Sequence, residues 1–163
     1  MHHSLVNGLL MHTLYVARTA EHLAELYSDV VDRDLLLAGT ILHDIAQCRE
    51  FVTSPLGLVT EYSVPGELLG HLVMGAQAVA DAARELEIPE KKSLLLQHML
   101  LSHHGEPEFG AAVRPMCAEA ELLSLIDLVD SRMEIYKENL AETDLGRFSK
   151  RIFALDKKIF RHQ

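Results

Sequence analysis

A chain of 163 residues, of which 48% are hydrophobic, has enough material for one domain whose core needs no disulfide staple. No apolar run approaches the roughly 20 residues that span a bilayer, and no signal segment opens the chain. Two cysteines are too few for a disulfide framework, so we expect a soluble, cytoplasmic protein with no membrane partner. The net charge of −9 excludes a nucleic-acid-binding surface that covers the whole molecule, because such binding draws on lysines and arginines.

The first part of the chain predicts two helices. Apolar residues recur near helical spacing over residues 5–27, which indicates an amphipathic helix with His12 on its inner stripe. An aspartate, which is a typical N-cap, opens a second helix over residues 32–46. The adjacent pair His43 and Asp44 is expected in the last turn of that second helix.

A flap and two more helices are expected next. Proline and glycine surround two short β-prone stretches, which predicts a small hairpin or flap near residues 51–62. Residues 67–86 are expected to form a long helix with His71 near its start. Another helix is predicted over residues 91–103, and two adjacent histidines lie at its C-terminal edge.

The last part of the chain predicts a loop and two further helices. A strongly apolar helix is expected over residues 118–140, with Asp127 and Asp130 three positions apart on one face. A basic helix over residues 148–160 is expected to close the chain. Together these elements predict an all-α fold, a helical bundle of about six helices that forms one domain over residues 1–163.

Charge is unevenly divided along the sequence. Residues 147–161 hold six basic residues and one acidic residue, a net charge of +5, which leaves −14 for the rest of the chain. This segment is either the solvated face of a terminal helix or an electrostatic footprint for a polyanion.

Histidines and aspartates recur at the expected helix ends and on apolar faces, at His12, His43, Asp44, His71, His103, His104 and Asp127. A single histidine on an apolar face is more often a core residue with satisfied hydrogen bonds than a metal ligand. Asp127 is harder to explain in that way, because its neighbours are apolar and a buried carboxylate needs a cation, a metal or another partner.

The adjacent pair His43 and Asp44 points to a site with two metal ions. Neighbouring residues of a helix point about 100° apart, so the carboxylate can bridge two ions while the imidazole binds only one. The candidate ligands are nitrogen and carboxylate oxygen without paired cysteines. We therefore expect two divalent ions, Mn²⁺ or Fe²⁺, with Mg²⁺, Zn²⁺ or Ni²⁺ as alternatives, rather than a structural zinc centre.

The order His, His-Asp, His, His-His, Asp within a helical chain resembles the HD-domain superfamily of metal-dependent phosphohydrolases. The likeness extends over nearly the whole chain, in the right order. The chain is similar to the C-terminal HD domain of the YhaM-type 3′→5′ exoribonucleases in the strings HHSLVNGLLMHTLYVA, DRDLLLAGTILHDI, TEYSVPGELLGH, LLSHHGEPEFG and LIDLVDSRM.

The resemblance implies a division of the ligands between two metals. One metal would be held by His12, His43, Asp44 and Asp127, and the second by His71, His103 and His104. Asp44 would bridge the two. The implied reaction is hydrolysis of a phosphoester by a water or hydroxide that bridges the metals. Catalysis is expected to depend on Asp44, on Asp127 and on Asp130, which either orients a ligand histidine through a hydrogen bond or faces solvent.

Two departures from the family pattern concern substrate binding. Many HD proteins carry a lysine that contacts the substrate phosphate where this chain has Gln47. We expect the substrate contacts outside the metal site to come from His3, Gln47 and Arg114, although Arg114 is equally explained as a solvated loop residue. The YhaM-type enzymes also carry an N-terminal OB-type domain, so either this chain is a piece of a longer protein or the natural protein lacks that domain.

Three functions are compatible with these features. The leading hypothesis is a phosphodiesterase that acts on single-stranded RNA or short oligonucleotides from the 3′ end. The alternative is a phosphohydrolase of small nucleotides, for which an acidic domain with a pocket is sufficient. The third is a non-catalytic regulatory module, against which the intact ligand set argues. A homo-oligomer and a separate OB-domain partner remain open.

Overall fold

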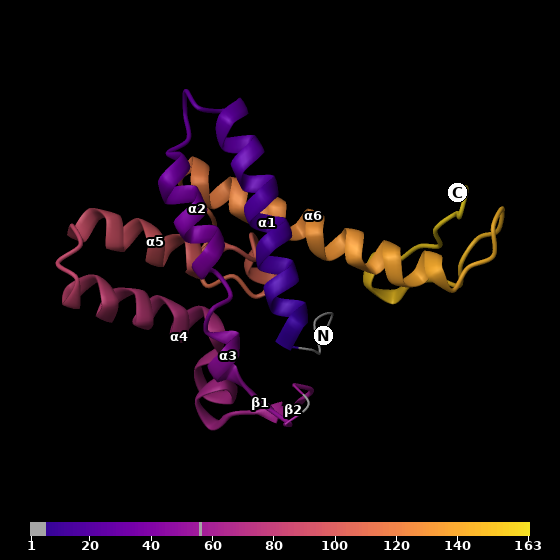
Figure 1. The fold of residues 1–163 in the computed structure, drawn as a ribbon, viewed down its shortest axis with the longest axis horizontal. Coiled ribbons are helices and arrows are strands. Elements are labelled where there is room, and N and C mark those ends of the chain that lie inside the picture. The colour runs from indigo at the N-terminus through magenta and orange to yellow at the C-terminus, as the bar shows by residue number, and fades with distance from the viewer. Residues whose placement is uncertain (1–5, 56) are drawn as a thin grey trace.

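A computed structural model describes residues 6–55 and 57–163, and helices make up most of them (Figure 1). The α-helices of this described part are α1 (Val6–Leu26), α2 (Arg33–Leu42), α3 (Gln47–Glu50), α4 (Val64–Glu85), α5 (Glu90–Ser102) and α6 (Ala118–Ala141). Strands β1 (Phe51–Thr53) and β2 (Val59–Tyr62) form an antiparallel hairpin between α3 and α4. The expected all-α class and the flap are therefore confirmed. None of the described helices is long and apolar enough to cross a membrane.

The core lies where α1, α2, α5 and α6 meet. On α1 the buried residues Val16, Ala20 and Ala24 are spaced by four, so they form one inward stripe that packs against the other helices. His12 lies four residues before Val16 and is also buried, at 3% exposure. The helical periodicity that builds the core therefore also aims His12 into the interior.

The end of α2 differs from the sequence prediction. The helix begins after the expected cap, since the side chain of Asp32 accepts hydrogen bonds from the next turn, but it ends at Leu42 rather than at residue 46. Beyond Leu42 the backbone makes the tighter bonds of turns, from the N–H of Ile45 to the carbonyl of Leu42 and from Gln47 to Asp44. These turns place the pair at 43 and 44 inside the molecule.

Helix α4 contains a kink that the sequence did not predict. Ser63 caps its start by accepting the N–H of Gly66, and the helix is then interrupted at Gly70, whose φ of 69° and ψ of 162° are not helical. Glycine tolerates this backbone conformation because it has no Cβ. The kink sets the position of His71, the residue that follows it.

The prediction of a helix over residues 148–160 is wrong. In its place the chain forms an irregular hairpin, with isolated antiparallel bridges between Phe148 and Phe160 and between Ile152 and Lys157. The segment contains β-branched and aromatic residues at positions where a hairpin can pair them, and such residues favour extended backbone over helix. We call residues 147–161 the C-terminal arm.

The arm is held together by a few specific contacts. The N–H of Ser149 donates to the carbonyl of Ile159, and both side chains are buried. Asp156 turns the chain back with a left-handed φ of 52°. The second half of α6 extends beyond the other helices, and the arm lies at its far end, opposite the turn between α4 and α5 (Figure 1).

The start of α4 packs closely on α3, so a substitution at this contact tests the fold. A Cβ at Gly66 would lie 2.2 Å from the backbone carbonyl oxygen of Glu50, which cannot move aside as a side chain could. We expect Gly66→Ala to lower the free energy of unfolding by about 1–3 kcal/mol in chemical denaturation. The exposed control Gln77→Ala on the same helix should stay within about 0.5 kcal/mol of the parent protein. A gain in stability for Gly66→Ala would contradict this packing.

Candidate metal centre

Four helices and the turn after α2 bring the predicted ligands to one place. All seven residues that the sequence singled out converge there, from α1, the turn after α2, the part of α4 after its kink, the C-terminal end of α5 and α6: His12, His43, Asp44, His71, His103, His104 and Asp127. Two of them, His43 and His103, are almost fully buried. Residues far apart in sequence thus form one cluster.

The first group of ligand atoms surrounds the Nε2 atom of His12. It lies 3.1 Å from Nε2 of His43, 3.2 Å from Oδ1 of Asp127 and 3.8 Å from Oδ2 of Asp44. Two ligands bound at right angles to one ion at about 2.1 Å lie about 3.0 Å apart. The atoms of this group are therefore close to the spacing that a shared divalent ion requires.

The second group faces the other oxygen of Asp44. Its Oδ1 atom lies 3.3 Å from Nε2 of His71 and 3.4 Å from Nε2 of His103, and His71, His103 and His104 each offer a ring nitrogen within 4.8 Å of the others. Among the described side chains, three buried atoms lack a hydrogen-bond partner: Oδ1 of Asp44, Nε2 of His71 and Nδ1 of His104. Buried polar atoms without partners are costly, and a cation among them would remove that cost.

Backbone carbonyls fix the orientation of the two most buried rings. The Nδ1 atom of His43 donates to the carbonyl of Thr40 at 2.7 Å, and that of His103 donates to Leu100 at 2.8 Å. A carbonyl can only accept, so Nδ1 carries a proton in both rings and Nε2 is the nitrogen left to face a metal ion. Both Nε2 atoms point toward Asp44, as metal ligands would.

Carboxylates play the same part for two other histidines. Nδ1 of His12 donates to Asp130 at 2.8 Å, and Nδ1 of His71 donates to Glu50 at 3.1 Å. The structure thus places Asp130 against a candidate ligand, one of the two roles considered for it. Glu50 was missed by the sequence analysis, because nothing in its own segment signals a partner 21 positions away.

The pKa of Asp44 is lowered in spite of its burial. Burial alone would raise the pKa of this carboxyl, but the imidazoles of His103, His43 and His71 around it outweigh that effect. Asp44 is therefore an anion, only 7% exposed, whose charge is available to a metal ion.

The pKa values of His12 and His104 are shifted in opposite directions. Burial disfavours the charged form of His12, yet hydrogen bonds to Asp127 and Asp130 prevail and raise its pKa to about 9. Burial and the neighbouring His103 lower the pKa of His104 to about 4. Without metal at neutral pH, His12 thus holds a proton where an ion would bind, whereas His104 is neutral.

The expected substrate contacts are not gathered at the cluster. His3 lies outside the described residues. Gln47 is half-buried and lines a separate apolar groove, with Leu9 and Phe51, to which none of the seven candidate ligands contributes. Arg114 is exposed and donates from Nε to Glu106 at 2.7 Å.

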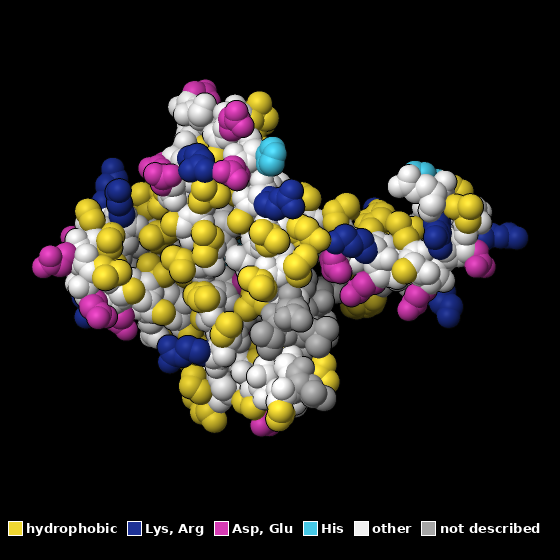
Figure 2. Space-filling model, in the orientation of Figure 1, with side chains coloured by type: hydrophobic (Ala, Val, Ile, Leu, Met, Phe, Trp, Pro, Cys, Tyr) yellow, Lys and Arg dark blue, Asp and Glu magenta, His cyan; other side chains and the backbone are white. Residues whose placement is uncertain are grey.

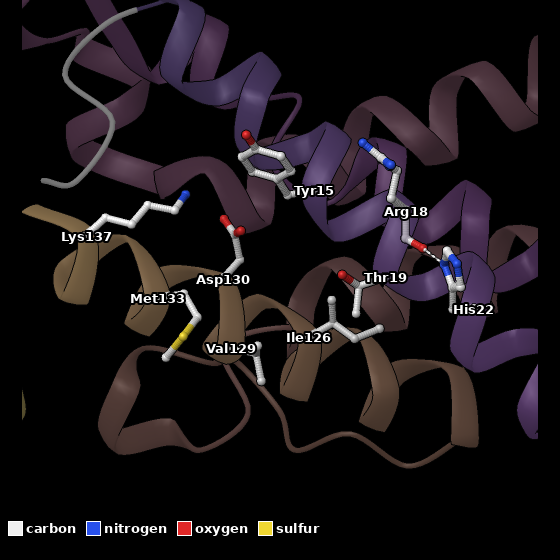
Figure 3. A pocket seen from close by; sticks show the side chains of 9 residues that line it. All are labelled: Tyr15, Arg18, Thr19, His22, Ile126, Val129, Asp130, Met133 and Lys137. Carbon is white, nitrogen blue, oxygen red and sulfur yellow. Dashed lines mark hydrogen bonds between the residues drawn. The ribbon is translucent and has the colours of Figure 1, made fainter. Parts of the chain in front are cut away.

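Two of the cavities lined by described residues lie beside the cluster. One, of about 390 Å³, is lined by His103, His104 and Asp127 together with Phe109 and residues of α6. The other, of about 610 Å³, lies between α1 and α6 (Figure 3). It reaches the site only through Asp130, and none of the seven candidate ligands lines it. The smaller cavity is therefore the one that opens on the ligands.

Comparison with known proteins agrees with this geometry. The family model described as "HD domain" matches residues 9–132, which include every candidate ligand. The chain belongs to the HD domain family. The matched residues hold most of α1, all of α2 to α5 and the first part of α6, whereas the C-terminal arm lies outside the match. No solved structure matches the chain.

Curated relatives are similar over nearly the whole chain. Over 159 residues, 98% of this chain, it is 42% identical to a protein of Bacillus licheniformis and 40% identical to one of Bacillus subtilis, each named 3′-5′ exoribonuclease YhaM. A Listeria innocua protein of the same name is 40% identical over the same length. The chain spans about half the length of these relatives, 49% of the two Bacillus proteins and 50% of the Listeria protein.

The proton on His12 gives a test of metal binding. An ion that binds Nε2 must displace this proton, because the pKa of about 9 keeps the ring protonated near neutral pH. We expect Mn²⁺ binding to release protons at about pH 7.5, and Mn²⁺ affinity to increase as the pH rises toward 9. Calorimetric titrations in buffers of different ionisation enthalpy measure the release.

The control is Asp130→Asn, which removes one of the carboxylates that raise the pKa of His12. This variant should release fewer protons at the same pH. Binding heats that do not depend on the buffer would contradict the displacement.

Proposed function

We propose that this HD domain is a divalent-metal-dependent phosphodiesterase that hydrolyses RNA or short oligonucleotides from the 3′ end. The observation that carries the proposal is the position of Asp44, whose two oxygens face two separate groups of imidazoles. The names of the relatives supply the substrate class, since they are called 3′-5′ exoribonucleases.

We assign the two groups of ligands to two ions. Oδ2 of Asp44 would act with His12, His43 and Asp127, and Oδ1 with His71, His103 and His104. Nitrogen and carboxylate oxygen without thiolate favour Mn²⁺ or Fe²⁺. When bound, two such ions lower the pKa of a water held between them and stabilise the charge that develops on the phosphoryl oxygens.

The protein side chains hold this arrangement and supply no nucleophile of their own. Asp44 would contribute one oxygen to each ion, since its Oδ1 and Oδ2 atoms face different groups of imidazoles. Asp130 holds the Nδ1 proton of His12 and so keeps Nε2 directed at Asp44 and Asp127. Replacing Asp130 should therefore weaken binding at one ion more than at the other.

The cavity beside the cluster is suited to the terminal nucleotide. Its volume of about 390 Å³ lies in the range of small-ligand sites, and His103, His104 and Asp127 form one wall. Phe109, 73% exposed, also lines the cavity and offers a face on which a base can stack. The scissile phosphate of a nucleotide held there would lie near the two ions.

The C-terminal arm offers a second contact for a strand. It has a net charge of +5, and its lysines and arginines lie on the part of the molecule that extends from the body (Figure 2). Phe153 is fully exposed and Phe148 is 67% exposed. Positive charge next to exposed aromatic rings is the combination that binds single-stranded nucleic acid without sequence preference.

A second candidate is a phosphohydrolase of mononucleotides. The acidic residues Glu106 and Glu121 also line the cavity, and they would repel the phosphates of a long strand more than a single nucleotide. A substrate screen with Mn²⁺ at low salt separates the candidates. Cleavage of mononucleotides without cleavage of oligonucleotides would replace the exonuclease proposal with this one.

Metal content tests the role of Asp44. We expect Asp44→Ala to lose both ions, because each group then lacks an oxygen, whereas His71→Ala should mainly empty the second site. Elemental analysis of the purified variants gives the number of ions bound per chain. Circular dichroism checks that each variant is folded. Equal metal content in Asp44→Ala and the parent protein would refute the bridging role.

Charge reversal tests the arm. Changing both Lys150 and Lys158 to glutamate should raise KM for oligoribonucleotides several-fold at low salt, because the arm then repels the strand. Hydrolysis of a small phosphodiester should stay nearly unchanged, since a small ester does not reach the arm.

The matched control changes Lys91 and Lys92 to glutamate. These exposed residues lie in the first turn of α5, far from the arm, and the variant carries the same change in net charge (Figure 1). Oligonucleotide KM should stay near the parent value. Equal effects of the two double variants would mean that overall charge, and not the arm, governs binding.

A further inference from the structure

Glu50 occupies a place that nothing else about the site explains. It is an acidic residue with only 5% of its surface exposed, and its Oε1 atom accepts two hydrogen bonds from one residue, His71. The backbone N–H of His71 donates at 3.0 Å and the ring Nδ1 at 3.1 Å. One oxygen therefore fixes both the main chain and the ring of a candidate metal ligand.

The kink in α4 creates the need for this contact. Because Gly70 is not helical, the helix restarts at His71, and the first N–H groups of a helix have no acceptor within it. Glu50 supplies the missing acceptor, and its negative charge also interacts favourably with the positive end of the helix dipole. Without a carboxylate there, the restarted helix would have an unpaired N–H close to the metal centre.

Glu50 is itself held firmly. Its N–H donates to the carbonyl of Ala46, its own carbonyl accepts the N–H of Ser63, and Gly66 packs against that carbonyl. The backbone N–H and carbonyl of Glu50 are thus both hydrogen-bonded, the first within α3 and the second to the residue that caps α4. The carboxylate reaches His71 from a rigid base.

We propose that Glu50 is the positioning residue of the second metal ion, acting through His71; the inference rests on the proposed function. With Nδ1 donating to Glu50, the lone pair of His71 is confined to Nε2, 3.3 Å from Oδ1 of Asp44. The carboxylate also makes the imidazole a better electron donor. The hydrogen bonds of the Glu50 carboxylate go to His71, a member of the second group of ligands, so its loss should weaken the second ion more than the first.

The test is Mn²⁺ binding to Glu50→Gln, a substitution that keeps the shape but removes the charge. We expect the second site to weaken by about 10–100-fold and the first to be retained. Electron paramagnetic resonance provides an independent readout. With the same amount of Mn²⁺ added per chain, the parent protein should show the signal of a coupled Mn²⁺ pair, and Glu50→Gln should show the signal of isolated Mn²⁺ ions.

Glu119→Gln is a matched control. Glu119 is also buried, at 8% exposure, and its Oε1 also accepts a backbone N–H, from Asp32 at 2.7 Å, but it lies at the start of α6 away from the ligands. This variant should lose stability and keep the coupled pair. The same loss of the second ion in Glu119→Gln would show that general destabilisation is responsible, which overturns the proposal.

The outcomes separate this inference from the proposed function. A parent protein that binds no second ion contradicts the proposed two-ion site itself. A parent protein with two ions and a Glu50→Gln variant with unchanged affinity for both overturns the role of Glu50 alone. Should Glu50→Gln not fold, Glu50→Asp, which shortens the reach to His71, must show the same selective loss, and retention of both ions there overturns the proposal.

Discussion

The carboxylate of Asp44 is a buried anion, and much of the fold serves to surround it. A charge removed from water costs several kcal/mol unless opposite charges or donors face it. The tight turns after α2 place it inside, while the kink in α4 and the end of α5 bring His71 and His103 to one of its oxygens. His12 and His43 approach the other. This division, one oxygen for each group of imidazoles, is the basis of the proposed two-ion chemistry.

A proton and a metal ion compete for the same space beside Asp44. The pKa of His12 in the folded protein, about 9, lies above the ordinary histidine value of 6.5, so its ion pairs with Asp127 and Asp130 contribute stability that is fully present below pH 6.5. That contribution is lost as the pH rises through 9. A bound cation can then replace the proton, so metal should matter most to stability at alkaline pH. In this way the site links folding, protonation and metal loading.

The sequence predicted what depends on local periodicity and missed what depends on distant contacts. Helical spacing located α1, α4, α5 and α6 within a few residues, and the ligand order identified all seven residues that converge. The spacing in residues 148–160 also fits a helix, but there the pairing of Phe148 with Phe160 prevails. The contact between Glu50 and His71 joins residues 21 apart through a kink, which no periodic pattern records. Gln47 was expected among the substrate contacts because it stands near the metal site in the sequence, and in the structure it lines an apolar groove with Leu9 and Phe51.

The most direct test of the account is anomalous diffraction from crystals grown with Mn²⁺. Two peaks are predicted, one among His12, His43 and Asp127 and the other beside His71 and the two histidines at the end of α5. Each peak should lie within coordination distance of a different oxygen of Asp44. A single peak, or two peaks of which neither contacts Asp44, would contradict the account.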